Sequence, residues 1–224
     1  QEFHSKKIRT GKVKLLAADT DLRPKYQYVD CLKYDAVACP YCGYAALDRF
    51  FKFMMPAQAR LIREHISANF KGLPATDSIY TYDDALERHQ LALLNTVIKK
   101  AKESERAYTC LKMAWICRGK AESLSEELPN YKAQLKELKG QEKELLENAY
   151  TGFETAFSKE SFPMCGMDEI TVSYLLAELA RRIGKFEESS RWISRVLISR
   201  DANDRIKNRA REIKELLNKD MHKA

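Results

Sequence analysis

Hydrophobic residues recur at helical spacing through the last two thirds of the chain, with polar residues between them. This pattern predicts amphipathic helices over about 82–101, 104–121, 129–158, 168–182, 186–199 and 202–219. Asp168 and the segment 201–204 supply residues that favour helix N-termini. Helices of this length are marginal alone in water, so we expect them to pack against one another.

The first third of the chain has a different pattern. The alternation in Lys12–Leu15 and the run Tyr34–Cys39 each predict a short strand. From Asp48 onward apolar residues return at helical spacing, and Gly72 and Pro74 then mark a boundary. We therefore predict two domains: a small β-rich module with a linking helix over 1–75, and a helical module over 76–224.

Three of the predicted helices share a pattern of small and bulky residues. A small residue is followed by a bulky one four positions later and by another small one three beyond: Ala85, His89 and Ala92; Ala149, Phe153 and Ala156; Ser189, Ile193 and Val196, whose last member is only moderately small. This pattern is typical of the second helix of a tetratricopeptide repeat. The predicted fold class is mainly α, a tetratricopeptide-like stack of helical hairpins with a zinc-ribbon-like N-terminal module. Ordinary helical-bundle packing remains the alternative.

Composition agrees with a mainly helical protein. The chain has 224 residues, only 8 Gly and 6 Pro, and 45% hydrophobic residues, which argues against a turn-rich all-β domain. We find no apolar run of 18 residues, so no transmembrane helix or membrane partner is expected. Without a recognisable signal peptide, we expect a cytoplasmic protein whose 6 cysteines are reduced.

The segment Cys39-Pro-Tyr-Cys42-Gly43 is the one motif that indicates chemistry. Two thiolates at this spacing can hold one Zn²⁺ from a tight turn, and glycine suits the turn. We therefore predict Cys39 and Cys42 as metal ligands and zinc as a structural cofactor. Zinc needs four ligands, and His4 and Cys31 are the nearest other candidates. A redox dithiol or an unliganded pair of thiols are the alternatives.

Positive charge is concentrated in the first third of the chain, which supplies most of the net charge of +7. Lys6, Lys7, Arg9, Lys12 and Lys14 could attract a phosphate backbone. Tyrosines are interleaved with these cations and could stack on bases, although filling a small core is the favoured role. Nucleic-acid binding is the alternative function. Tyr41, at the tip of the cysteine turn, is the first residue to test for partner contact.

No constellation of residues supports an enzyme. Phosphate-binding glycine loops, metalloprotease helices and serine-hydrolase elbows are all missing from the sequence. We expect His65 to face solvent or cap a helix, and His89 to pack between helices. Asp19 and Asp21 could pair as acid and base, but a turn before Pro24 is the simpler interpretation.

Several short segments resemble a known family. Asp19-Thr-Asp21, Tyr34-Asp-Ala-Val37 and Cys39-Pro-Tyr-Cys-Gly-Tyr-Ala45 are similar to the bacterial family called domain of unknown function 2225, as are Pro24-x-Tyr26 and Phe51. The resemblance implies a tetratricopeptide-like C-terminal region. It also implies another Cys-Pro-x-Cys just before a segment like Gln1-Glu-Phe3. Cys39 and Cys42 would then be the second knuckle of a zinc ribbon.

These observations together predict a non-enzymatic adaptor. The stacked helices would present a concave groove to a protein or peptide partner, and metal would act as a structural staple. The alternative is a nucleic-acid-binding protein that uses its basic N-terminal ribbon.

Overall fold

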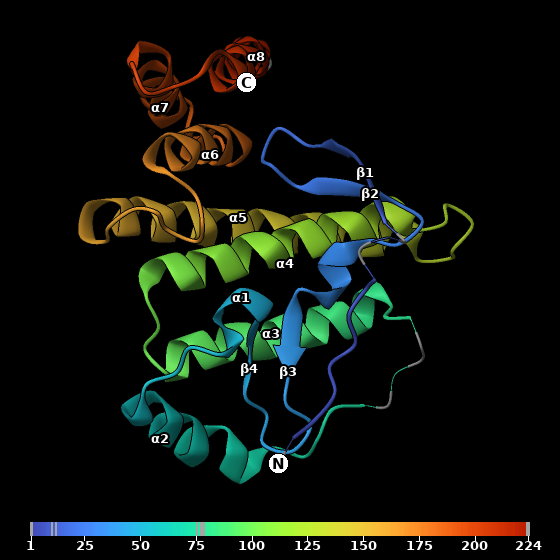
Figure 1. Ribbon diagram of the computed structural model, residues 1–224. Coiled ribbons are helices and arrows are strands. Elements are labelled where there is room, and N and C mark those ends of the chain that lie inside the picture. The colour runs from blue at the N-terminus through green and yellow to red at the C-terminus, as the bar shows by residue number, and fades with distance from the viewer. Residues whose placement is uncertain (1, 10, 12, 75, 77–78, 223–224) are drawn as a thin grey trace.

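The fold is a stack of long helices with two small sheets packed against one side (Figure 1). The computed structural model describes residues 2–9, 11, 13–74, 76 and 79–222. The long helices are α3 (Tyr82–Ile98), α4 (Glu103–Ser123), α5 (Tyr131–Lys159), α6 (Glu169–Arg182), α7 (Phe186–Ile198) and α8 (Asp204–Met221). The mainly helical fold class with a small β-rich N-terminal part is therefore confirmed.

The six predicted spans match α3 to α8 to within a few residues. Asp168 accepts a hydrogen bond from the N–H of Thr171, and Asn203 accepts one from the N–H of Ile206, so both cap a helix as the sequence indicates. The predicted helix over 82–101 ends early. Lys100 has a φ of +51°, in the left-handed region that terminates α-helices.

The strands form two separate antiparallel pairs. Strand β1 (Lys14–Ala18) pairs with β2 (Pro24–Gln27), with a bulge between Leu15 and Ala17, and β3 (Ala36–Ala38) pairs with β4 (Ala45–Leu47). The predicted first strand included Lys12, which lies outside the described residues. The short helix η2 (Cys31–Tyr34) connects β2 to β3, and α1 (Asp48–Phe51), α2 (Pro56–His65) and η3 (Ser67–Asn69) lie between β4 and α3 in the chain. The predicted strand over Tyr34–Cys39 is shorter because η2 takes up its first residue.

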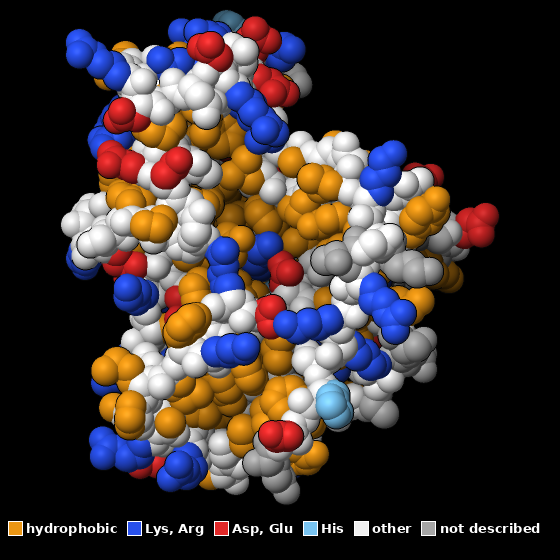
Figure 2. Space-filling model, viewed as in Figure 1, with side chains coloured by type: hydrophobic (Ala, Val, Ile, Leu, Met, Phe, Trp, Pro, Cys, Tyr) orange, Lys and Arg blue, Asp and Glu red, His pale blue; other side chains and the backbone are white. Residues whose placement is uncertain are grey.

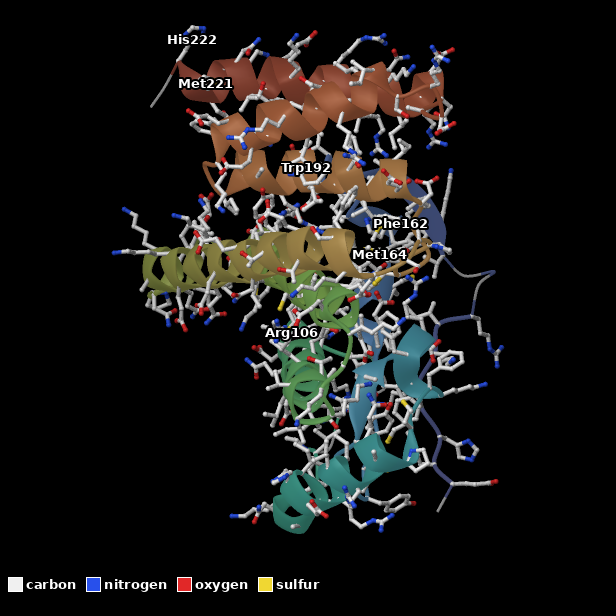
Figure 3. All side chains as sticks on the ribbon, turned by 90° about the vertical axis from the view of Figure 1, so that its left-hand side faces the viewer. Arg106, Phe162, Met164, Trp192, Met221 and His222 are labelled. Carbon is white, nitrogen blue, oxygen red and sulfur yellow. The ribbon has the colours of Figure 1, made fainter. Side chains whose placement is uncertain are left out.

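Small residues bring the long helices close together. The repeated small positions of α3, α5 and α7 are all buried: Ala85, Ala92, Ala149, Ala156, Ser189 and Val196. Larger rings fill the spaces at the helix ends. The ring centroid of Phe157 in α5 lies 5.2 Å from that of Phe162, in the loop before α6, and 5.0 Å from that of Trp192 in α7. Figure 3 labels Phe162 and Trp192, which both lie beside α5.

The N-terminal strands share their core with the helices. Ala36, Ala45 and Leu47 of β3 and β4 form one buried cluster with Ala92 of α3. Leu22, in the turn between β1 and β2, packs against two further clusters in the helical stack. The division at residues 75/76 therefore stays a prediction. No helix among the described residues has the length and apolar character needed to cross a bilayer.

Candidate functional site

The predicted cysteine motif forms a tight turn between β3 and β4. The N–H of Cys39 donates to the carbonyl of Tyr44 at 2.8 Å, and the N–H of Gly43 donates back to the carbonyl of Cys39 at 3.2 Å. Gly43 has a φ of +71°, and a Cβ placed there would lie 2.6 Å from Cδ2 of Phe70. Glycine is required here both for the backbone conformation and for the close approach of Phe70.

Neighbouring helices hold this turn from two sides. The hydroxyl of Ser67, in η3, donates to the carbonyl of Cys42 at 2.9 Å. The side-chain amide of Asn95, buried in α3, donates to the carbonyl of Gly43 at 3.1 Å. The position of both cysteines is therefore set by tertiary contacts as well as by the hairpin.

The thiols of Cys39 and Cys42 lie close enough to interact, as the spacing predicts. Burial raises the pKa of the Cys42 thiol, and its hydrogen bond with Cys39 raises it further. Within the described part of the chain, no group of three or more His, Cys, Asp or Glu side chains could hold a metal ion. His4 and Cys31 therefore do not complete a site with Cys39 and Cys42. Zinc ligation by Cys39 and Cys42 therefore stays a prediction.

The tip of the cysteine turn is exposed. Tyr41 is 57% exposed, as the sequence predicts, and Phe53 and Met55, which follow α1 in the chain, are 75% and 67% exposed. Phe3 packs against the buried cluster that contains Cys39 and Tyr44, with its ring centroid 5.9 Å from that of Phe51.

A second arrangement of functional groups lies where the β1–β2 hairpin meets the helices. Asp21, in the hairpin turn, is fully buried and accepts hydrogen bonds from Arg118 at 2.6 Å and from the indole of Trp115 at 3.1 Å. Arg118 of α4 also donates to Asp19 at 3.0 Å and to Glu142 of α5 at 2.7 Å. One guanidinium thus joins the hairpin turn to two helices.

The aspartate pKa values show that these groups are paired as ions. Burial alone would raise the pKa of Asp21, but the hydrogen bond and charge of Arg118 outweigh it, and the net pKa is lowered. For Asp19, burial is likewise outweighed, by hydrogen bonds from Lys25 and Arg118. Both carboxylates are ionised at neutral pH, so neither has the raised pKa of a general acid.

The hairpin turn also contacts α6. The hydroxyl of Thr20 donates to the buried carboxylate of Glu178 at 2.5 Å, and Tyr174 donates to the carbonyl of Thr20 at 2.5 Å. Arg209 of α8 lies within 3.4 Å of the carbonyl of Asp19. The turn is therefore held by three helices, α4, α6 and α8. Figure 2 shows hydrophobic side chains gathered where the hairpin meets this stack.

A protein-family model described as "Uncharacterized protein conserved in bacteria (DUF2225)" matches residues 1–217. The chain belongs to this family. The resemblance found in the sequence is therefore confirmed, and it extends over nearly the whole chain. No curated protein and no solved structure matches this family member. The family description assigns no activity, so the function must be argued from the site itself.

The remaining candidate residues lie in structural positions. His89 is fully buried in α3 and its Nδ1 lies 2.7 Å from the carbonyl of Ala85, which agrees with the predicted packing role. Burial lowers the pKa of His89, so it is neutral. Burial raises the pKa values of Cys110 and Cys117 to about 11 and that of Cys165 to about 12. These thiols are protonated at neutral pH and are poor nucleophiles.

Sequence reasoning missed the ionic contacts between the hairpin and the helices. Asp19 and Asp21 were predicted to form a turn, which they do, but their partners Trp115 and Arg118 lie almost a hundred residues away. Trp115 and Arg118 are three residues apart and therefore share a helix face, which was the available indication of a common site.

Proposed function

We propose that the protein is a non-enzymatic adaptor that binds a protein or peptide segment on the face formed by α4, α6 and α8. The observation that carries this proposal is the hairpin itself. This face already holds an irregular chain segment through two carboxylates, a backbone carbonyl and the side chain of Leu22. The hairpin occupies these groups, so a partner segment would bind beside it, where the same helices offer similar chemistry.

The helix arrangement supports a tetratricopeptide-like interpretation of this surface. Helix α6 contacts its neighbour α7 and also α8, as the first helix of such a repeat contacts its own partner and the next first helix. The bulky repeat positions are buried too: His89, Phe153 and Ile193. In this interpretation α4, α6 and α8 line the inner face of the stack.

We further propose that Cys39 and Cys42 provide half of a structural zinc site. Two more ligands are needed, and the family resemblance implies another Cys-Pro-x-Cys upstream of Phe3. Phe3 packs beside the cysteine turn, which supports this arrangement. A site of four thiolates has no open position, so zinc would staple the fold rather than act as a Lewis acid. A reducing cytoplasm suits these thiols, and cytoplasmic localisation stays a prediction.

Affinity purification from the bacterial host tests the adaptor proposal. We expect a discrete protein to co-purify in near-stoichiometric amounts after nuclease treatment and to remain bound between about 0.1 and 0.5 M salt, because apolar contacts are insensitive to screening. Nucleic-acid binding predicts a different result, a loss of 10³-fold or so in affinity for a single-stranded oligonucleotide over a smaller rise in salt.

The contacts of the basic segment favour the protein partner. Lys7 pairs with Asp48 at 2.9 Å, and Lys6 donates to the hydroxyl of Thr76 at 3.1 Å. Lys7 therefore has a carboxylate partner within the chain, which offsets part of the charge that it could offer to a phosphate backbone, while the hydroxyl that accepts from Lys6 carries no charge.

Elemental analysis tests the zinc proposal. Protein purified from its host should carry about one zinc per chain, and Cys39→Ser or Cys42→Ser should lose it, because a structural site needs all its thiolates. Cys31→Ser is the matched control and should keep the metal. Wild-type protein that folds without zinc would overturn the proposal.

A further inference from the structure

Strand β1 is an open sheet edge beside α8. Its backbone has hydrogen-bond partners only in β2, judged over the described residues, and all five of its residues are exposed. A hollow of about 790 Å³ separates β1 from the start of α8. It is lined by Leu15, Leu16, Ala17, Ala18, Arg205, Asn208 and Arg209. An open edge of this kind is a template for one further strand.

The side chains on this edge are unusual for a free strand. Soluble proteins protect open edges with charges, yet Leu15 and Leu16 are 59% and 58% exposed. Lys14 and the bulge between Leu15 and Ala17 are such devices on β1, but neither covers the two leucines. The edge therefore combines unused backbone groups with apolar surface that a partner could cover.

The charged side chains that line the hollow are all positive. Arg205 and Arg209 line it, no carboxylate does, and Lys14 lies at the start of β1. Arg205 is exposed and has no ion-pair partner among the described residues. Arg209 also lines the hollow; its guanidinium lies 5.6 Å from the ring centroid of Tyr174 and within 3.4 Å of the carbonyl of Asp19. An occupant that brings carboxylates would find partners here.

We propose that β1 and α8 bind an extended acidic segment of a partner protein, which adds to the sheet as a third strand. Main-chain hydrogen bonds to β1 would supply affinity, Leu15 and Leu16 would contact its apolar side chains, and Arg205 and Arg209 would select glutamate or aspartate. The proposal rests on the adaptor function and identifies the chemistry of its partner. The chain's own acidic turn, held by Arg118 on a neighbouring surface, is a precedent for such recognition.

Charge argues against a second copy of this chain as the occupant. Two β1 strands paired across a dyad would bring Lys14, Arg205 and Arg209 of both molecules to one place. No acidic residue lines the hollow to offset this repulsion.

A synthetic peptide tests the proposal directly. The probe is a fluorescein-labelled decapeptide of alternating glutamate and valine, and fluorescence anisotropy is measured with the full chain in about 0.15 M salt. We expect saturable binding. The same peptide with lysine for glutamate should not bind, and a version methylated at every backbone nitrogen should bind about tenfold more weakly or not at all, because it cannot donate to β1.

Charge reversal on α8 identifies the surface. Arg205→Glu should weaken binding of the glutamate–valine peptide about tenfold, since it replaces attraction with repulsion. Lys207→Glu is the matched control, because it makes the same change in net charge outside the hollow. Its affinity for the peptide should stay within about twofold of the wild-type value. Glutamate is favoured in the first turn of a helix, so Arg205→Glu is expected to fold, which far-UV circular dichroism checks.

Several results would overturn the proposal. The first is that the glutamate–valine peptide does not bind, and the second is that the lysine peptide binds equally well. The third is that Arg205→Glu and Lys207→Glu lose the same amount of affinity for the peptide. Dimerisation that Arg205→Glu abolishes would assign the edge to a second copy instead, and binding of single-stranded RNA alone would assign it to nucleic acid.

If the peptide fails to bind while a host protein still co-purifies at 0.5 M salt, only this inference is wrong. If the peptide binds as expected and no host protein is recovered, the adaptor proposal fails instead.

Discussion

At the scale of single residues, buried charge is the main feature of the hairpin contact. Asp21 and Glu178 are both fully buried, and each is matched by at least one arginine. Removing a carboxylate from water costs several kcal/mol unless donors replace the water, so these residues depend on their partners. The acid–base interpretation of Asp19 and Asp21 is therefore unnecessary, since the lowered pKa values follow from pairing.

Arg118→Ala should destabilise the protein strongly. The substitution leaves the buried carboxylate of Asp21 without its main donor, which costs about 3–5 kcal/mol in the free energy of unfolding. Urea denaturation followed by far-UV circular dichroism measures the loss. Lys120→Ala on the same helix is the control, because Lys120 pairs with Asp83, whose side chain is 74% exposed, and such pairs contribute less than about 1 kcal/mol. Equal losses in the two variants would contradict the buried pairing.

Acid should weaken the hairpin contact. The folded-state pKa values of Asp19 and Asp21 lie below their usual value, so the folded protein binds fewer protons than the unfolded chain. Their contribution to stability is complete above the unfolded pKa of about 3.9 and is lost as the pH falls through the lower folded values. Urea midpoints at pH 7, 5, 4 and 3 measure this loss, with the fall beginning near pH 5. In Asp19→Asn the urea midpoint should fall less steeply with pH. An unchanged pH profile in this variant would refute the role of Asp19 in the acid sensitivity.

At the scale of elements, close approach of helices depends on particular glycines. A Cβ added at Gly152 in α5 would lie 2.8 Å from the Cβ of Ala107 in α4, so the two helices are in contact there. Gly140 in the same helix has open space around it. The two glycines therefore have different roles that their shared helical setting does not reveal.

Gly152→Ala and Gly140→Ala should have opposite effects on stability. The first forces α4 and α5 apart and should cost about 1–3 kcal/mol in the free energy of unfolding. The second removes conformational freedom from the unfolded chain without a clash and should stabilise the protein by up to about 1 kcal/mol. Thermal unfolding of both variants measures the difference, and a stabilising Gly152→Ala would show that the helices are not in close contact there.

At the scale of the whole molecule, the sheets and the helices share one set of cores. Ala36 and Leu47 pack with Ala92, and Leu22 packs with two clusters in the helical stack. Loss of either part therefore exposes apolar surface of the other. This coupling makes independent stability of residues 1–75 unfavourable.

We expect one cooperative unfolding transition. Far-UV circular dichroism reports mainly on the helices, and tryptophan fluorescence reports partly on the hairpin because the indole of Trp115 donates to Asp21. The two probes should give coincident urea curves. An earlier fluorescence transition would mean that the hairpin leaves the stack before the helices unfold.

The sequence by itself determined the long helices, two of their N-terminal caps and the cysteine turn. These features depend on residues close together in the chain: the 3.6-residue repeat of apolar positions, Asp168 and Asn203 at helix starts, and Gly43 after two cysteines. Only the tertiary structure decided which helices receive the hairpin, since Asp21 meets Trp115 and Arg118 across more than ninety residues. Local pattern shows that a side chain prefers burial or pairing. Its partner is chosen by the packing of the whole chain, which no local pattern contains.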